Sequence, residues 1–538
     1  MGKLIWILCI ALAGSCMAFA DEDHHHEELT QQQLGTVHFS VSCTPDAEKT
    51  FEKGVALLHS FWYEEAEKSF QDAAKQDSKC AMAYWGEAMS LWHQLWNRPD
   101  AATIKQGAAE LEQADELRAP TAHERDYVHA LQAFYSNSEK ADHDARARAY
   151  SAAMEKVYKK YPDDHEAAAF YALSLLASEP DGDTTFANRK QAGAILEKLF
   201  AEEPTHPGIA HYLIHAYDKP QLAQLGLPAA RRYAQIAPAA PHALHMPSHI
   251  FARLGLWQDD IDSNLASIAA TRKATEMHMG GEGHQFHAMD YLVYAYLQSG
   301  REAEALKVIE EVKAMPPMKD MYGMGYDPRV YALVAFPARY ALEMHHWAEA
   351  AALTYVPDTE GGDAAITYWA RAIGAARSGN VAQAHTDIEH IETIRKTLLD
   401  RKKKNYADAV EQDRKEATAW LDHAEGRNET ATAALRAIAE KEEASGDESD
   451  GGTPAREMLA DMLLDMKHPE QALAEYKTSL KFFPNRFDSL YGAAQAAEMA
   501  GQTSEATEYY AVLVKTCEGG SSARPELAKA KQAVVALK

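Results

Sequence analysis

The sequence predicts an all-α fold in which helical hairpins stack one after another into a right-handed superhelical solenoid. Apolar and alanine residues recur at intervals of three and four through most of the chain, which is the helical period. Period-two alternation, which marks half-buried strands, is almost absent. An array of repeats also explains how 538 residues fold without one large compact core.

The repeat itself is clearest near the C-terminus, where three positions recur at an offset of 34 residues. They are Ala472, Tyr476 and Leu480, which return as Ala506, Tyr510 and Val514. An offset of 34 is the tetratricopeptide period, and Pro484 ends the earlier unit where that repeat usually places a proline. Near the start, Gly54 and Phe70 occupy small and aromatic positions of the same repeat.

Residues 1–20 are interpreted as a secretory signal. Lys3 supplies the positive start, Leu4 to Ala13 form an apolar run too short to span a bilayer, and Ala18-Phe19-Ala20 is a cleavage site. A lipoprotein signal with its cysteine at Cys16 is the competing interpretation, but Ala13 fits that box poorly. We therefore expect cleavage after Ala20 and a periplasmic or secreted protein.

After the signal, the chain divides into four stretches: an acidic segment with three histidines, a main repeat domain, a polar linker and a C-terminal repeat pair. Their ranges are 21–45, 46–445, 446–455 and 456–538. Within the main domain the inner helices are expected at 121–138, 163–178, 206–218, 241–256, 284–299, 327–345 and 363–378. His24, His25 and His26 in the acidic segment are at most a loose metal-binding tail.

The charge balance excludes some classes of partner. Asp plus Glu total 80 against 54 for Lys plus Arg, a formal charge of -26. Phosphate contacts need a basic face, so neither a nucleic-acid partner nor an anionic membrane is expected. After the signal there is no run of eighteen apolar residues, so no transmembrane segment is expected either.

Export permits disulfides, and cleavage leaves Cys43, Cys80 and Cys517. Cys43 lies just before the first expected helix and Cys80 begins the third. A bridge between them would close a loop of about 38 residues and contribute roughly 4 kcal/mol in the chain-entropy model. We expect this bridge and a free Cys517, with two unpaired thiols as the alternative.

Histidines are concentrated in one window: nine of the 25 lie between residues 206 and 287. Their spacing forms two rows that recur on three successive inner helices. One row is His211, His249 and His287 at offsets of 38 and 38, and the other is His206, His245 and His284 at offsets of 39 and 39. Equivalent positions on neighbouring repeats lie side by side on the concave surface, so these rings are expected to face one another.

This ladder predicts a transition-metal site. Imidazole suits copper, zinc, iron and nickel, and a pair at i and i+4 places two nitrogens on one helix face. The predicted ligands are His211, His215, His245, His249, His284 and His287, with His206, His242 and Asp290 as auxiliary or orienting groups. Pro247 interrupts the middle segment, so a kink or a helix restart is expected there. The competing interpretation is that these histidines are core hydrogen-bond partners.

Methionines make copper the first metal to test, with zinc or iron next. Met315, Met318, Met321 and Met324 recur every three residues in a loop, and thioethers are soft ligands that select Cu(I). Methionines also fill irregular gaps in cores, and packing is the competing interpretation.

Two segments resemble a broad group of exported bacterial tetratricopeptide-repeat proteins. They run from His206 to Asp218, reading HPGIAHYLIHAYD, and from Pro241 to Phe251, reading PHALHMPSHIF. Residues 55–61 and 80–86 resemble the same group, and the resemblance covers roughly residues 40 to 350. It implies an all-helical repeat fold in a periplasmic or extracellular setting, but it implies no reaction.

Two functional hypotheses from different classes follow. The first is an exported helical-repeat protein that binds a transition metal ion or a small ligand at the histidine cluster. The second is a non-enzymatic repeat scaffold whose groove binds a protein or peptide partner. The usual catalytic motifs, such as G-x-S-x-G, H-E-x-x-H and the Walker loop, are absent, so no reaction is assigned.

Overall fold

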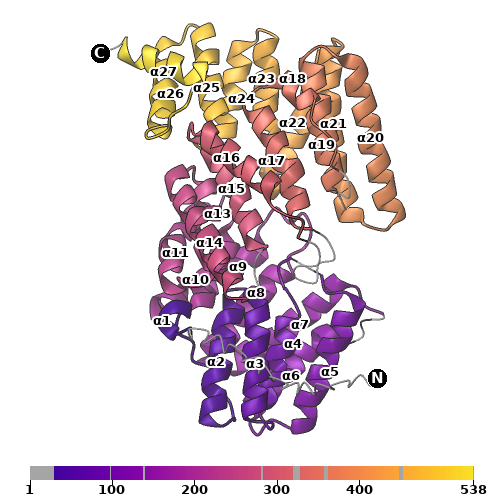
Figure 1. The fold of residues 1–538 in the computed structure, drawn as a ribbon, viewed down its shortest axis with the longest axis vertical. Helices are drawn as coiled ribbons and strands as arrows, with labels where there is room; N and C mark the ends of the chain where they lie inside the picture. Colours follow the sequence, from indigo (N-terminus) through magenta and orange to yellow (C-terminus); the bar gives the residue numbers. More distant parts are fainter. Residues whose placement is uncertain are drawn as a thin grey trace, which may run out of the picture.

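The structure is a computed structural model, and it describes residues 29–96, 98–136, 138, 140–279, 283–318, 327–356, 362–446 and 452–536. All regular secondary structure in these ranges is α-helical, and they contain no β-strand. The helices pack in consecutive pairs along a curved stack (Figure 1). The predicted all-α fold of stacked helical hairpins is therefore confirmed.

The first half of the stack, drawn from indigo to magenta in Figure 1, contains helices α1 to α14. Their bounds are α1 Gln31–Leu34, α2 Pro45–His59, α3 Tyr63–Gln76, α4 Ala81–Ser90, α5 Ala101–Leu117, α6 Ala122–Tyr135, α7 His143–Lys160, α8 His165–Ala177, α9 Ala187–Glu202, α10 Pro207–Tyr217, α11 Ala223–Ile236, α12 Pro241–His245, α13 Pro247–Arg253 and α14 Trp257–Glu276. Helices α1 to α13 and the C-terminal end of α14 share one apolar core cluster, which runs from Leu34 to Met279.

The second half contains helices α15 to α27. Their bounds are α15 His284–Gln298, α16 Glu302–Ala314, α17 Arg329–Glu343, α18 Trp347–Ala351, α19 Asp363–Arg377, α20 Val381–Asp400, α21 Lys404–Ala424, α22 Asn428–Ser445, α23 Ala455–Asp465, α24 Pro469–Phe482, α25 Phe487–Met499, α26 Thr503–Thr516 and α27 Pro525–Val535. The inner helices begin and end within three residues of the ranges expected from sequence.

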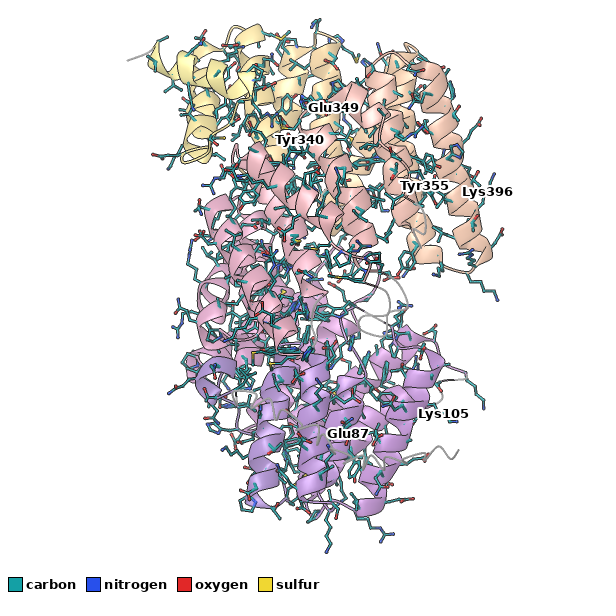
Figure 2. All side chains as sticks on the ribbon, in the orientation of Figure 1. Glu87, Lys105, Tyr340, Glu349, Tyr355 and Lys396 are labelled. Carbon is teal, nitrogen blue, oxygen red and sulfur yellow. A yellow bond between two sulfur atoms is a disulfide. The ribbon has the colours of Figure 1, made fainter. Side chains whose placement is uncertain are left out.

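Small residues let neighbouring helices approach closely, as the repeat pattern predicts. A Cβ atom on Gly86 would lie 2.3 Å from the ring of Phe70, and one on Gly54 would lie 2.7 Å from the same ring. Gly492 stands in the same relation to Tyr476 near the C-terminus, at 2.3 Å. Side chains fill the space between the helices along the whole stack (Figure 2).

The break in the middle histidine segment falls where Pro247 predicts it. Helix α12 ends at His245 and α13 begins at Pro247, which has no N–H to donate to the preceding turn. Met246, between the two helices, keeps right-handed helical torsions. Proline also begins α10, where its missing N–H costs nothing.

The polar segment 446–455 does not separate two cores. Helix α22 ends at Ser445 and α23 begins at Ala455, and residues 447–451 lie outside the described part. Leu435 before the segment and Leu459 after it belong to the same apolar cluster. Helices on either side of 446–455 therefore pack as continuous repeats.

The C-terminal repeats fold back onto the middle of the stack, where α25 contacts α15 (Figure 1). The indole N–H of Trp257 donates to the carbonyl oxygen of Asn485 over 2.8 Å. Arg486 is fully buried and pairs with Glu343 at 2.6 Å and with Glu457 at 2.9 Å. These contacts join segments that are 29 to 228 residues apart in sequence.

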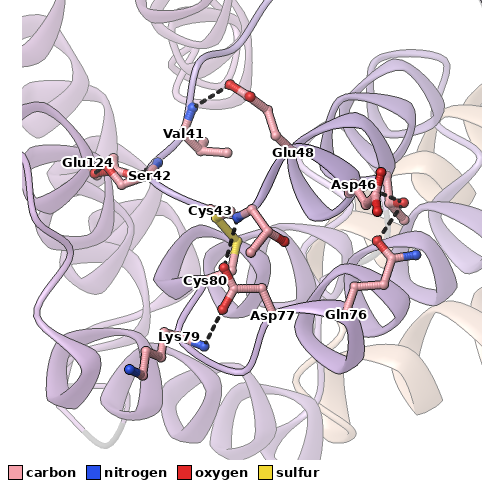
Figure 3. The surroundings of a disulfide bond; sticks show 12 residues. Val41, Ser42, Cys43, Asp46, Glu48, Gln76, Asp77, Lys79, Cys80 and Glu124 are labelled. Carbon is pink, nitrogen blue, oxygen red and sulfur yellow. Dashed lines mark hydrogen bonds between the residues drawn. A yellow bond between two sulfur atoms is a disulfide. The ribbon is translucent and has the colours of Figure 1, made fainter.

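Cys43 and Cys80 form the predicted disulfide, which ties the segment before α2 to the start of α4 (Figure 3). The carboxylate of Asp77 supports this corner by accepting from the backbone N–H groups of Thr44 and Lys79, at 2.9 and 3.0 Å. Cys517 is a free, buried thiol, and burial raises its pKa to about 12.

Among the described residues no helix is long and apolar enough to cross a bilayer. The predicted signal at 1–20, with its cleavage site after Ala20, lies outside those residues, as do His24, His25 and His26.

Candidate metal centre

The histidine-rich helices α10, α12, α13 and α15 pack against one another and bring their imidazole rings together. Burial differs along the array. His211 and His245 are buried, His215 and His249 are partly buried, and His287 is exposed. The described residues contain three groups of potential ligands in which the nearest nitrogen and oxygen atoms all lie within 4.8 Å of one another.

The first group, here called triad A, is His211, His215 and His242. The Nε2 atoms of His215 and His242 lie 3.0 and 3.1 Å from Nε2 of His211. Phe61 forms an aromatic wall against all three rings, with its centroid 4.3 Å from that of His211. Three nitrogens from two helices therefore point at one spot in an apolar surrounding.

The second group, triad B, is His245, His249 and His287. The Nε2 atoms of His245 and His249 lie 2.9 Å apart. The ring of His287 lies 4.5 Å from that of His245, measured between centroids. Each triad thus combines an i, i+4 pair with one histidine from the next inner helix.

Groups behind the rings fix which nitrogen carries the proton in triad B. Nδ1–H of His249 donates to the carboxylate of Asp218 over 2.8 Å, and a carboxylate accepts only. Nδ1–H of His245 donates to Oδ1 of Asn264 over 2.7 Å. The amide nitrogen of Asn264 is committed to Asp260, so its oxygen must face the imidazole.

The two facing nitrogens of triad B are consequently both acceptors. A neutral imidazole has one N–H, and when both rings are neutral His245 and His249 each use it at Nδ1. Two lone pairs then face each other across 2.9 Å without a hydrogen atom between them. Burial is the main cause that lowers the pKa of His245 well below its usual value, so protonation of that ring does not relieve the contact at neutral pH. A cation between the nitrogens would relieve it.

Triad A is built in a related way. Nδ1–H of His211 donates to the backbone carbonyl of His59 over 2.6 Å, which leaves Nε2 of His211 as a lone pair. One lone pair accepts one well-aligned hydrogen, yet both His215 and His242 point at it. Burial lowers the pKa of His211 to about 3 and the pKa of His242 well below its usual value. Nδ1 of His242 is buried and has no hydrogen-bond partner in the described structure.

The third group, His59, Glu166 and His206, is different because its hydrogen bonds close without a cation. Each imidazole lies 2.8 Å from one oxygen of the buried Glu166 through its Nε2. The Nδ1 atoms have partners as well. Nδ1 of His59 contacts the Tyr212 hydroxyl, and Nδ1 of His206 accepts from the Ile209 N–H. Burial alone raises the pKa of Glu166, but the two imidazoles outweigh it and lower that pKa. We interpret this group as a structural network.

The predicted ligands are distributed as follows. His211 and His215 fall in triad A, whereas His245, His249 and His287 fall in triad B. His242, expected as an auxiliary residue, supplies the third nitrogen of triad A. His284 belongs to neither triad, and its ring lies 5.3 Å from that of His242.

The remaining auxiliary residues lie elsewhere. His206 belongs to the Glu166 network and caps α10 by accepting from the Ile209 N–H. Asp290 forms an ion pair with the buried Arg339 at 2.6 Å. Of the methionines, Met315 and Met318 pack on the apolar cluster of α14 to α17, whereas Met321 and Met324 lie outside the described residues.

Sequence reasoning missed His59 and Glu166, which lie on α2 and α8, 107 residues apart. It also missed Asn264 on α14, because one buried asparagine has no spacing that marks it. The sequence held a signal for His59, since this residue lies inside the segment 55–61 that carries the family resemblance.

A polar cavity of about 530 Å³ borders triad A at His215. Its lining includes His215 of triad A and Asp218, the partner of His249 in triad B. Trp96 also lines it, and that ring lies 5.2 Å from His242 and 6.3 Å from His215. Among the triad histidines, the cavity therefore opens onto His215.

Comparisons with known proteins give no family. No protein-family model matches the chain, and no curated protein matches its sequence. Among solved structures, a human IFIT1 dimer with m7Gppp-AAAA is similar at 12% identity and a TM-score of 0.38, covering 90% of this chain and 98% of that one. A Naa15/Naa10 complex bound to HypK-THB is similar at 10% identity and a TM-score of 0.20, covering 91% of each chain. Likenesses this weak carry no argument about function.

Proposed function

We propose that this helical-repeat protein binds transition metal ions at triads A and B. The observation that carries the proposal is the pair of facing lone pairs on His245 and His249, 2.9 Å apart and each locked by a hydrogen bond at Nδ1. A metal ion is the partner that such a pair lacks. The carboxylate behind His249 and the amide behind His245 are the outer groups that usually orient metal-bound imidazoles.

The nitrogen spacing also supports a metal. Two donors about 2.0 Å from one ion, at angles of about 90 to 110°, lie about 2.8 to 3.3 Å apart. The measured separations of 2.9, 3.0 and 3.1 Å fall in this range. Three imidazole nitrogens leave a fourth position open for an exogenous ligand. Copper, zinc and iron all accept nitrogen ligands. Copper is the first candidate, and zinc or iron is the next.

The test is metal analysis of protein purified without a tag. We expect copper, zinc or iron to bind with a Kd tighter than about micromolar, measured by competition with a chelator. His215→Ala and His287→Ala should each lower the metal content, whereas His129→Ala, which changes an exposed histidine of α6, should not. No tight binding, or equal content in all the variants, would contradict the proposal.

A second candidate function is binding of a peptide or partner protein. A cavity of about 280 Å³ lies between α17, α19, α21 and α22, and Tyr331, Trp369 and Tyr406 are among its lining residues. Tyr406 is 55% exposed, and exposed aromatics are frequent anchors of protein interfaces. This function would be favoured if the unmodified chain captures a partner protein that Tyr406→Ala no longer captures and Tyr355→Ala still does.

We also propose that the protein is exported to the periplasm or the medium. The Cys43–Cys80 disulfide supports it, because structural disulfides persist in oxidising compartments. The mature protein from the native host should begin at Asp21. An N-terminus at Met1, or a lipid-modified Cys16, would contradict cleavage after Ala20.

A further inference from the structure

The cavity between α17, α19, α21 and α22 has aromatic rings from three helices in its wall: Tyr331, Trp369 and Tyr406. The face of an aromatic ring is negatively polarised, so such rings attract cations, and tryptophan attracts them most strongly. Nζ of Lys403, which is not among the described lining residues, already lies 5.7 Å from the ring centroid of Tyr406. The volume of about 280 Å³ is near the lower end for ligand pockets, so the cavity suits one small head group.

The charge of the lining also favours a cation. Among the described residues that line the cavity, the acidic side chains outnumber the basic ones: Asp363, Asp413 and Glu442 against Arg339 and Lys441. The charge of Arg339 is balanced by Asp290, whose carboxylate lies 2.6 Å from its guanidinium. The excess of carboxylates gives the cavity a negative potential.

A further carboxyl group lies directly behind two lining residues, at Glu416 of α21. It is fully buried and accepts from two neutral donors, the indole N–H of Trp369 at 3.0 Å and the amide of Gln412 at 3.3 Å. The same amide nitrogen donates to Glu442 over 2.8 Å, so one side chain holds two carboxyl groups near each other. Burial is the main cause that raises the pKa of Glu416 well above its usual value, and the charges of Glu442 and Asp413 raise it further. A cation in the cavity would relieve this repulsion.

We propose that this cavity binds an alkylammonium group, which the aromatic rings and the carboxylates of its wall stabilise together. A methylated ammonium group is weakly hydrated and presents no strong hydrogen-bond donor, so ring faces and nearby carboxylates are the partners that recognise it. The inference rests on the cavity of the second candidate function and supplies its ligand chemistry, and it is independent of metal binding at triads A and B. The group can belong to a free small molecule or to a lysine side chain of a partner.

The experiment is calorimetric titration of the full chain at neutral pH with choline and with the uncharged isostere of choline, in which carbon replaces the nitrogen. The two probes have nearly the same shape, so their difference isolates the charge. We expect one choline per chain, bound at least about tenfold more tightly than the isostere, which is the scale of cation–π attraction in a partly desolvated site. A third probe, N-acetyl-lysine amide, represents a partner side chain. Tighter binding of choline supports a free ligand, and tighter binding of the lysine probe supports a partner.

Two variants place the ligand in the cavity. Tyr406→Ala removes a ring and Asp413→Asn removes a charge, and each should weaken the binding of choline by about tenfold. Tyr355→Ala, which truncates another exposed tyrosine, and Asp408→Asn, which changes an exposed carboxylate of α21 paired with Lys404, are the matched controls. Both controls should bind choline as the unmodified chain does. Circular dichroism melting checks the fold of each variant.

The contradicting outcomes are distinct. Equal affinity for choline and its isostere, no binding of any of the three probes, or undiminished binding in Tyr406→Ala and Asp413→Asn would overturn the ammonium site. Capture of a partner that depends on Tyr406, without binding of any ammonium probe, would also overturn it and leave the second candidate function intact. Removal of metal with a chelator should leave choline affinity unchanged, and a loss of affinity would place choline at the metal sites and overturn the assignment to this cavity.

Discussion

At the scale of single residues, hydrogen-bond direction separates the three histidine groups. His59 and His206 have complementary partners at both nitrogens, so Glu166 completes a closed network. Apart from each other, His245 and His249 have partners at Nδ1: Asn264 and Ser248 at His245, and Asp218 and Tyr291 at His249. The same residue type therefore serves structure in one group and offers free lone pairs in the other.

Asp218→Asn tests the carboxylate behind triad B. An amide can still accept from Nδ1–H of His249, but it has no charge, so metal affinity at triad B should fall about 10- to 100-fold. Chelator competition measures this fall. Asp259→Asn, an exposed residue of α14 paired with Arg231, is the control and should leave the affinity unchanged. An unchanged affinity in Asp218→Asn would show that His249 is not a ligand.

Asp461 on α23 predicts a dependence of stability on pH. Burial, with the nearby charge of Glu457, raises its pKa to about 7 although Arg377 lies 3.5 Å away. The folded state then holds a proton that the unfolded state releases near pH 4, so the contribution of Asp461 to stability falls as pH rises from about 4 to 7. Asp461→Asn should remove this fall.

Urea unfolding at pH 5 and pH 8 measures the effect of Asp461. The difference in free energy of unfolding between the two pH values should shrink by about 2 to 4 kcal/mol in Asp461→Asn. Asp465→Asn is the control on the same helix, with a side chain that is 51% exposed. An equal change in both variants would argue against a buried, protonated Asp461.

At the scale of elements, close packing of α10 on α2 positions triad A. A Cβ atom on Gly208 would lie 2.4 Å from Nδ1 of His59, whose carbonyl accepts from His211. The absence of a side chain at Gly208 therefore lets α2 support a proposed ligand on α10.

Gly208→Ala should destabilise the fold by about 1 to 3 kcal/mol, because the new methyl group displaces the ring of His59. It should also weaken metal binding at triad A. Gly362→Ala is the matched control: its Cβ atom would lie 3.4 Å from Val410, and stability should change by less than about 0.5 kcal/mol. Chemical denaturation compares the two, and equal stability would contradict the packing argument.

The sequence predicted the helices better than it predicted which histidine rings lie together. Helical periodicity located α10, α12–α13 and α15, and Pro247 marked the break between α12 and α13. The offsets of 38 and 39 residues matched equivalent positions on successive repeats, but they did not show which rings meet. That choice depends on helix rotation and on the break at Pro247, which is why His242 and not His284 completes triad A.

At the scale of the whole molecule, the C-terminal repeats fold back onto the middle of the stack, where α25 contacts α15. Arg486 lies where α15, α17, α23 and α25 meet, and it neutralises Glu343 and Glu457 in a fully buried position. The sequence could not predict this contact, because its partners lie 29 to 143 residues away and no repeat offset relates them.

Arg486→Met should destabilise the protein by about 3 to 5 kcal/mol, because it leaves two carboxylates buried without a cation. Hydrogen exchange should rise first in α25 to α27 while α2 to α8 remain protected. Arg436→Met removes a half-exposed ion pair with Glu475 and should cost less than about 1 kcal/mol. A uniform loss of protection would mean that the fold-back does not act as a separate unit.

The measurement that tests the central claim most directly is anomalous diffraction from metal-loaded crystals at the absorption edge of the bound metal. The account predicts two peaks, one at each triad, each about 2.0 to 2.2 Å from three imidazole Nε2 atoms. No peak at either triad, or peaks confined to the His59–Glu166–His206 group or to surface histidines, would contradict it.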